Sequence, residues 1–159
     1  VQEKQIPDLT VVSADLGFAK QARNWGEALN VPVALVEKRR VDNAERPEVL
    51  SVIGQVKGRN VLLVDDEVNT GGSVVNAVRV LREEGARDIY LAFTHGFLTE
   101  QSCKRLGALG LEEIIFTNTV PLPPERVLPN MTVLSVGPLL AEVIRRAHLG
   151  QSVGELFNE

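Results

Sequence analysis

The chain has little sulfur and few aromatic side chains. Its 159 residues include one cysteine, one methionine, one tryptophan, one tyrosine and two histidines. Because Cys103 is the single cysteine, an internal disulfide is excluded, and a reducing cytoplasmic location is expected. The one cysteine and two histidines, at positions 95, 103 and 148, do not have the spacing typical of zinc ligands. No apolar run approaches the ~20 residues that cross a bilayer, so no membrane partner is expected.

The chain also has no excess of positive charge. Its 17 Lys and Arg residues are outnumbered by 21 Asp and Glu residues, which gives a net charge of −4. Since nonspecific binding to nucleic acid needs a positive surface, a nucleic-acid partner is not expected. A length of 159 residues with 44% hydrophobic residues instead predicts one globular domain over residues 1–159, large enough to bury a sizeable core.

The most informative stretch is residues 61–73, Val-Leu-Leu-Val-Asp-Asp-Glu-Val-Asn-Thr-Gly-Gly-Ser. The four aliphatic residues predict a buried strand, since parallel strands that are covered on both faces are continuously apolar. Two carboxylates, Asp65 and Asp66, follow where that strand should end. A Thr-Gly-Gly-Ser turn comes next, and then apolar residues at helical spacing: Val74, Ala77, Val78 and Leu81. The stretch therefore predicts a strand, an acidic pair, a glycine turn and a helix.

This order of features suits the binding of a sugar phosphate. Glycines let backbone N–H groups approach an anion, and a helix N-terminus adds unpaired N–H groups and the positive end of its dipole. The hydroxyls of Thr70 and Ser73 can donate further hydrogen bonds. Asp65 and Asp66 are placed to accept hydrogen bonds from ribose hydroxyls, directly or through a divalent cation. The sequence contains neither a Walker loop nor a dinucleotide-binding Gly-x-Gly-x-x-Gly.

The remainder of the chain predicts alternating strands and helices. Such alternation predicts an α/β fold with a mostly parallel sheet and helices on both faces. In the helix over residues 18–30, Trp25 falls on the apolar stripe and is predicted to be buried. The strands are expected over residues 9–13, 31–36, 49–56, 61–64, 89–94, 114–117 and 133–136, and the other helices over 74–84, 99–109 and 138–147.

Three further places could belong to a site. Asp15 follows the first strand, where it could cap the next helix or bind a metal or a ribose hydroxyl. His95 follows the 89–94 strand and is open to a structural or a site role. Lys38, Arg39 and Arg40 follow the 31–36 strand, and residues 41–48 predict a flexible loop. Cations there could close over a polyphosphate, since ligands of open α/β sheets bind at the carboxyl ends of the strands.

Residues 61–73 resemble the phosphoribosyl pyrophosphate (PRPP) loop of the type I phosphoribosyltransferase superfamily. Other segments narrow the resemblance to the C-terminal half of the ribose-phosphate pyrophosphokinases, or PRPP synthetases. Ser13-Ala-Asp15-Leu-Gly17-Phe-Ala-Lys20 is similar to that family's Ser-Pro-Asp-x-Gly-Gly-x-Lys, and Lys38-Arg39-Arg40 to its Lys-x-Arg. The segments Thr94-His95-Gly96, Thr117-Asn118-Thr119-Val120-Pro121 and 134–157 also resemble the family. Asn69 stands where the family usually has aspartate, and Phe18 stands where it has glycine.

The resemblance implies an Mg²⁺-dependent enzyme that transfers diphosphate from ATP to ribose 5-phosphate to give PRPP. It implies a type I phosphoribosyltransferase-like fold, an N-terminal half that supplies most of the ATP site, and a homo-oligomer. The implied site residues are Lys38 and Arg40 over the transferred group, Asp15 at the metal, Asp65 and Asp66 at the ribose hydroxyls, and Asn69, Thr70, Gly71, Gly72 and Ser73 at the 5-phosphate. The resemblance also implies that the C-terminal helix, with Leu139, Leu140, Val143 and Ile144, packs against the other half. The chain alone is then expected to bind substrate but to make little product.

Two other functions stay open. A PRPP-using phosphoribosyltransferase would need a region that recognises a base, and the sequence shows none. A regulatory or scaffold homologue of a PRPP synthetase is compatible with Asn69, since an amide can neither act as a base nor carry charge. The presence of Lys38, Arg40 and the glycine turn favours the catalytic family over the scaffold.

Overall fold

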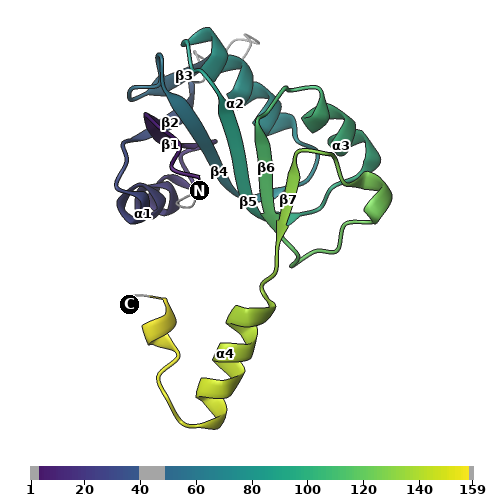
Figure 1. Ribbon diagram of the computed structural model, residues 1–159. Coiled ribbons are helices and arrows are strands. Elements are labelled where there is room, and N and C mark those ends of the chain that lie inside the picture. Colours follow the sequence, from purple (N-terminus) through teal and green to yellow (C-terminus); the bar gives the residue numbers. More distant parts are fainter. Residues whose placement is uncertain (1–3, 40–48, 158–159) are drawn as a thin grey trace.

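A seven-stranded sheet organises the molecule. The computed structural model describes the backbone of residues 4–39 and 49–157. The strands lie in the order β3-β2-β1-β4-β5-β6-β7, and every neighbouring pair is parallel except β2 and β3 (Figure 1). The strands are β1 Leu9–Ser13, β2 Val33–Arg39, β3 Val49–Ile53, β4 Asn60–Val68, β5 Ile89–Gly96, β6 Glu113–Thr117 and β7 Met131–Leu134. The predicted α/β class with a mostly parallel sheet is confirmed.

Helices connect the parallel strands and cover both faces of the sheet. The α-helices are α1 Ala19–Leu29, α2 Gly72–Glu83, α3 Glu100–Gly107 and α4 Gly137–His148, and two 3₁₀ turns are η1 Pro124–Arg126 and η2 Gly154–Leu156. The chain moves from β1 to β2 in one direction along the sheet, and from β4 to β5 and β6 in the other. Because such crossovers are right-handed, α1 must lie on the face opposite to α2 and α3.

Two apolar clusters, one on each face, form the core. The larger cluster joins α2 and α3 to the sheet through residues such as Val78, Leu81 and Leu106. The smaller cluster lies under α1 and includes Ala22, Val11 and Leu62. The central strand β4 contributes to both, because its side chains alternate between the faces. The two clusters fix β4 and its carboxyl end firmly within the molecule.

The prediction that Trp25 is buried was wrong. Its side chain is 38% exposed, whereas Ala22 and Gly26 of the same helix are buried. A Cβ atom on Gly26 would lie 2.3 Å from Val33 Cγ2, so α1 approaches β2 through this glycine. The glycine sets the contact face of α1 and turns Trp25 toward solvent. The apolar residues of α1 therefore predicted its buried face only in part, because Gly26 makes the closest contact with β2.

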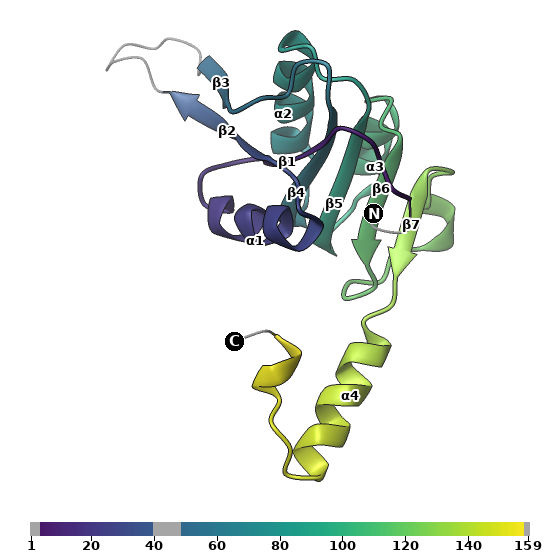
Figure 2. The same cartoon turned by 60° about the vertical axis from the view of Figure 1, so that its left-hand side comes forward.

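The second strand is longer than predicted. It continues through Glu37, Lys38 and Arg39, which pair in antiparallel register with Ser51, Leu50 and Val49 of β3. The backbone of Lys38 therefore lies in a strand and not in a loop, because the hairpin partner supplies hydrogen bonds that the sequence pattern does not reveal. The two strands project from the sheet as an arm (Figure 2). Arg40 and the predicted loop over residues 41–48 lie outside the described residues.

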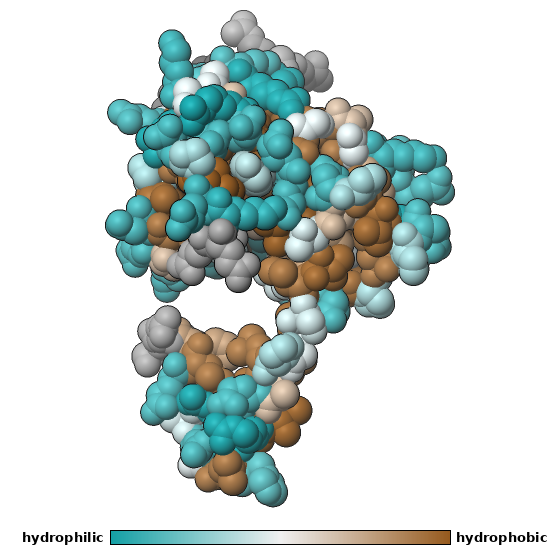
Figure 3. All heavy atoms as spheres, in the orientation of Figure 1, coloured by the Kyte–Doolittle hydropathy of each residue, from teal (hydrophilic) through white to brown (hydrophobic). Residues whose placement is uncertain are grey.

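Beyond β7 the chain leaves the sheet. Helix α4 and turn η2 form a separate hairpin that extends from the end of β7 (Figure 1). No residue of α4 is buried, and Leu139, Leu140 and Ile144 are exposed. Apolar side chains gather on the surface of this segment (Figure 3). Within residues 4–39 and 49–157, no helix has the length and apolar character needed to cross a membrane.

Candidate functional site

The candidate site lies at the carboxyl end of β4, where the chain turns into α2. Strand β4 ends at Val68 and α2 begins at Gly72, so three residues make the turn. The last of these, Gly71, has φ of +75°, a left-handed conformation that other residues adopt at a cost. The turn also lies beside the point where strand order reverses, between β1 and β4. Open α/β sheets bind ligands at such points.

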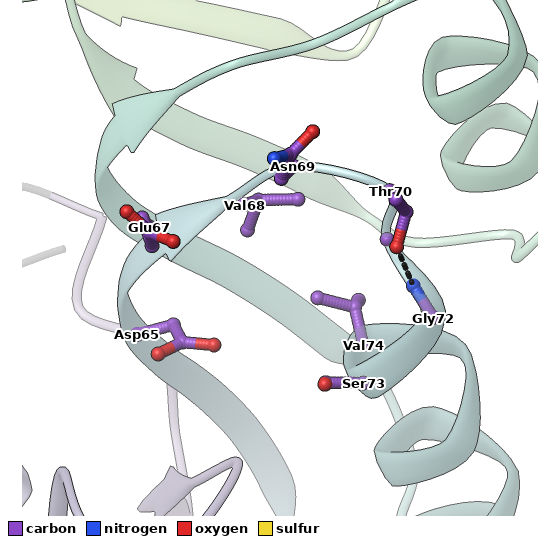
Figure 4. Close-up of a pocket in the computed structure, with 9 residues that line it drawn as sticks. Asp65, Glu67, Val68, Asn69, Thr70, Gly72, Ser73 and Val74 are labelled. Atoms are coloured by element: carbon purple, nitrogen blue, oxygen red, sulfur yellow. Dashed lines mark hydrogen bonds between the residues drawn. The ribbon is translucent and has the colours of Figure 1, made fainter.

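A pocket of about 150 Å³ occupies this turn. Six of the seven residues predicted to bind substrate line it: Asp65, Asn69, Thr70, Gly71, Gly72 and Ser73. The Asp65 carboxylate and the Ser73 hydroxyl point toward one another, while the Asn69 amide is directed away from both (Figure 4). Thr70 Oγ1 lies 3.4 Å from the backbone nitrogen of Gly72. The structure thus brings two carboxylates, two hydroxyls and the glycine turn around a single space.

Backbone N–H groups supply the positive side of the pocket. In the part of the chain that the structure describes, the N–H groups of Gly71, Ser73 and Val74 have no hydrogen-bond acceptor. These groups belong to the turn and to the first helical residues, where an α-helix leaves its N–H groups unpaired. The positive end of the α2 dipole adds to their field. The pocket is therefore suited to an anion with several oxygen atoms.

Carboxylates supply the negative side. Burial is the main cause that raises the pKa of Asp65 to about 6; the charges of Asp15 and Asp66 act in the same direction, and a backbone hydrogen bond opposes them. Mutual repulsion among three carboxylates marks a place where a divalent cation or donor hydroxyls would be favourable. Within residues 4–39 and 49–157, no three His, Cys, Asp or Glu side chains are arranged to hold a metal by themselves. Mg²⁺ nevertheless fits such a place, since it is commonly held by one or two carboxylates together with substrate phosphates.

Glu67 lines the pocket, and the predicted residue Asp66 does not. Asp66 does not line the pocket, and its Oδ1 accepts the Glu67 N–H at 2.8 Å. Glu67 does line the pocket, although the sequence reasoning gave it no role. Strand side chains alternate between faces, so residues 65 and 67 share one face of β4 and residue 66 takes the other. Counting from Asp65 by two would have found Glu67.

Asp15 lies at the end of β1, the neighbour of β4. Ser13 pairs with Val64, which places Asp15 at the same sheet edge as Asp65. Its Oδ1 accepts the backbone N–H of Phe18 at 3.0 Å, just before α1 begins. Helix α1 has Phe18 as its N-cap residue and no side-chain cap, so Asp15 closes the turn before α1 and does not cap the helix. The charge of the Asp15 carboxylate also raises the pKa of Asp65.

His95 lies beside the site on the next strand. It pairs in register with Glu67, and its Nδ1 is 2.9 Å from Thr119 Oγ1. The Thr119 hydroxyl in turn donates to the carbonyl oxygen of Thr94 at 3.1 Å. The ring is exposed and bonded to a threonine, so the structural and the site roles both remain compatible with its position.

The predicted catalytic cations are only partly placed. The backbone of Lys38 belongs to the last residues of β2, and Arg40 lies outside the described residues. Strands β2, β1 and β4 are parallel, so the carboxyl end of β2 lies at the same edge of the sheet as the turn after β4. The backbone therefore brings Lys38 to the predicted edge, one strand beyond Asp15.

Comparison with known proteins identifies the family. The family model for the phosphoribosyl synthetase-associated domain matches residues 40–158. The chain belongs to this family. The matched residues of this phosphoribosyl synthetase-associated domain include the whole β4 turn and pocket.

Two relatives of the domain carry the same name. The chain is 43% identical over 150 residues to a ribose-phosphate pyrophosphokinase of Caldanaerobacter subterraneus subsp. tengcongensis, an alignment of 94% of this chain and 47% of the relative. It is 44% identical over 154 residues to a ribose-phosphate pyrophosphokinase of Mycobacterium leprae, an alignment of 95% of this chain and 47% of the relative. The chain therefore spans about half the length of the curated relatives it matches.

Solved structures agree with the fold. A phosphoribosylpyrophosphate synthetase from Mycobacterium smegmatis superposes with a TM-score of 0.82 at 40% identity, over 90% of this chain and 46% of that one. An APRTase from Giardia lamblia, solved with 9-deazaadenine, superposes with a TM-score of 0.56 at 15% identity, over 83% of this chain and 71% of that one. The second likeness shows the fold alone. The domain thus has the phosphoribosyltransferase fold that its sequence predicted.

Proposed function

We propose that this phosphoribosyl synthetase-associated domain is the ribose 5-phosphate-binding half of a ribose-phosphate pyrophosphokinase. The reaction is transfer of the β,γ-diphosphoryl group of ATP to the anomeric hydroxyl of ribose 5-phosphate, which gives PRPP. The observation that carries the proposal is the β4 pocket, which is lined both by residues with unpaired N–H groups at the start of α2 and by Asp65. A sugar phosphate has the matching pair of groups, an anion at one end and hydroxyls at the other.

Different site residues bind different parts of the substrate. The 5-phosphate is bound by the turn: Asn69, Thr70, Gly71, Gly72 and Ser73. Asp65 lines the pocket and accepts hydrogen bonds from the ribose hydroxyls. Asp66 lies outside the pocket and adds its negative charge near the same end. Lys38 and Arg40 close over the diphosphoryl group and stabilise its charge, since catalysis of phosphoryl transfer is mainly positioning and electrostatics. These residues orient the hydroxyl and hold the anion while the diphosphoryl group moves.

Asp15 is the residue we assign to Mg²⁺. It lies one strand from Asp65, and the crowding of their charges favours a cation between protein and substrate. When bound, Mg²⁺ neutralises phosphate charge and polarises the phosphoryl oxygens. Asp15 and Asp65 orient the ribose end toward that charge.

The other half of the enzyme is the natural partner. The relatives are about twice as long as the aligned region, so the ATP site is assigned to an N-terminal half that these 159 residues do not include. The exposed stripe Leu139, Leu140 and Ile144 on α4 packs against that half. The complete enzyme is a homo-oligomer that binds ATP. The isolated chain accordingly binds ribose 5-phosphate and PRPP but turns over little.

One observation favours a second function. Asn69 lines the pocket where the family usually has aspartate, so the turn lacks a charge and a proton acceptor there. A regulatory or scaffold partner of an active synthetase would tolerate this loss. A large gain of synthetase activity from Asn69→Asp in the full-length protein would support the scaffold function, because it would show that the native turn is impaired.

Calorimetric titration of the chain with ribose 5-phosphate, with and without Mg²⁺, tests the main proposal. Ribose and inorganic phosphate are the control ligands, and each is expected to bind much more weakly than ribose 5-phosphate. Ser73→Ala should weaken binding of ribose 5-phosphate and of phosphate, whereas Asp65→Asn should weaken only ribose 5-phosphate. Absence of binding by the wild-type chain would contradict the proposal. Turnover of a base with PRPP would instead identify a phosphoribosyltransferase.

A further inference from the structure

Three carbonyl oxygens at the β4 turn, those of Val68, Thr70 and Gly71, accept hydrogen bonds from groups that do not line the pocket. An anion site of backbone N–H groups fails if a carbonyl oxygen turns into it, because the oxygen repels the anion. The carbonyl oxygen of Val68 accepts the N–H of Phe97 at 2.9 Å, and that of Gly71 accepts the N–H of Val75 at 2.9 Å. The carbonyl oxygen of Thr70 instead accepts Arg105 Nη1 at 3.1 Å. Of these three bonds, only the one from Arg105 uses a side chain.

Arg105 is presented by a helix that packs against the turn. Helix α3 begins at a capping box, in which the side chains of Thr99 and Ser102 each accept a backbone N–H of the other. The next residue after Arg105, Leu106, is buried, and its Cδ2 would lie 3.7 Å from a Cβ atom on Gly71. Consecutive residues of α3 thus contact consecutive residues of the turn, one through a hydrogen bond and one through packing.

The charge of Arg105 is not neutralised nearby. Its neighbour Lys104 forms an ion pair with Glu100 at 2.6 Å. For Arg105, the residues that the structure describes provide no carboxylate within salt-bridge distance, and the bond to Thr70 is the one found. An arginine is always charged and presents several donors in a fixed plane. Arg105 therefore brings a positive charge to the outer side of the turn while it holds the Thr70 carbonyl.

We propose that Arg105 is a positioning residue for the phosphate site. By binding the Thr70 carbonyl oxygen, it keeps the N–H groups of the turn directed into the pocket. This inference rests on the proposed function, because it assigns the turn to the 5-phosphate. Arg105 does not line the pocket, so it acts through the turn and not by contact with the ligand.

Calorimetry with ribose 5-phosphate compares three variants of α3. Arg105→Ala should weaken binding about five- to tenfold, and Arg105→Lys should recover part of the loss. Lys104→Ala is the matched control, because it removes a neighbouring cation that does not bond the turn. Its affinity should match the wild type within twofold. If Arg105 acted only through its field, 0.5 M salt would abolish the difference; a positioning role predicts that most of it remains.

A second measurement needs no ligand. The amide NMR signals of Gly71 and Gly72 should shift in Arg105→Ala and stay in place in Lys104→Ala, with equal thermal unfolding midpoints for all variants. If Arg105→Ala leaves both the affinity and these signals unchanged, the positioning role is overturned. If the wild-type chain binds no ribose 5-phosphate while the signals still shift, the proposed function fails and Arg105 keeps its effect on the shape of the turn.

Discussion

Helices α2 and α4 have the same length but differ in burial. Each has 12 residues, and each carries an apolar stripe at helical spacing. Five residues of α2 are buried, including Val78 and Leu81, whereas no residue of α4 is buried. The two helices differ in what lies beside them. Helix α2 follows the central strand and packs on the sheet, whereas α4 follows the edge strand β7 and extends away from it (Figure 1).

The difference in burial between α2 and α4 shows what an amphipathic pattern predicts and what it does not. The pattern says that one face of a helix prefers to be covered. It does not say which surface covers that face, because the cover comes from distant parts of the sequence or from another part of a longer protein. For α2 the cover is the sheet of this domain, and for α4 the proposed cover is the other half of the enzyme. Matched substitutions in the two regions can therefore separate a covered helix from an uncovered one.

The largest effect is expected from the same truncation in each helix. Leu81→Ala removes a side chain that is 0% exposed in the larger core cluster, and it should lower the free energy of unfolding by about 2–5 kcal/mol. Leu140→Ala removes a side chain that is 54% exposed, and it should change that free energy by no more than about 0.5 kcal/mol. Urea unfolding followed by circular dichroism measures both.

Equal costs for the two substitutions would show that α4 is covered in the isolated chain. Repeating Leu140→Ala in the full-length protein sharpens the comparison. If α4 packs against the other half as proposed, the cost of Leu140→Ala should rise there, while the cost of Leu81→Ala should stay the same.

Features with a local cause were predictable from the sequence, and features with a distant cause were not. The order of strand, acidic pair, turn and helix over residues 61–83 was predictable because each follows from neighbouring residues, but β4 continues through Asp65 and Asp66 to Val68 instead of ending before them. The extension of β2 through Arg39 was not, because it depends on pairing with β3. The exposure of Trp25 was not predictable either, because Gly26 makes the contact with Val33. The position of Glu67 follows from the alternation of side chains along β4. The hydrogen bond from Arg105 to Thr70 could not be predicted, because it joins residues 35 apart in sequence.

The next effect compares the starts of α3 and α4. Thr99 accepts the N–H of Ser102 at 3.2 Å within the capping box, so Thr99→Ala should lower the free energy of unfolding by about 1 kcal/mol. Ser135 Oγ accepts the N–H of Gly137 at 3.1 Å just before α4. Because α4 is not packed on the sheet, Ser135→Ala should leave the urea midpoint of the domain unchanged. A comparable loss from both substitutions would mean that α4 unfolds together with the core.

An effect of about the same size follows from the pKa of Asp65, which burial raises from 3.8 to about 6. A carboxyl group whose pKa is higher in the folded state takes up protons on folding, so its contribution to stability falls as pH rises from about 4 to 6. Asp65→Asn should therefore stabilise the ligand-free chain at pH 7, by about 1 kcal/mol after allowance for partial exposure, and lose this advantage below pH 4. Urea midpoints from pH 4 to 8 measure the difference. Glu67→Gln, in the same pocket, is the control, and an advantage for Asp65→Asn that does not vary with pH would refute the assignment.

The smallest effect is expected in α4, where an acid titrates in the opposite direction. Hydrogen bonds from Arg145 and then Arg146 lower the pKa of Glu142 to about 2, with Nε donors at 2.8 and 2.9 Å. Its contribution is therefore present above the unfolded pKa near 4.5 and is lost as pH falls toward 2. Since these groups are exposed, salt screens them. Glu142→Gln should reduce the helical ¹³Cα shifts of α4 at pH 7 in low salt, but not at pH 2 or in 1 M salt. Glu142→Gln should not change the urea midpoint of the sheet in any of these conditions, because Glu142, Arg145 and Arg146 stabilise a helix that has no residue in the core. A shift of that midpoint would contradict the separation of the two regions.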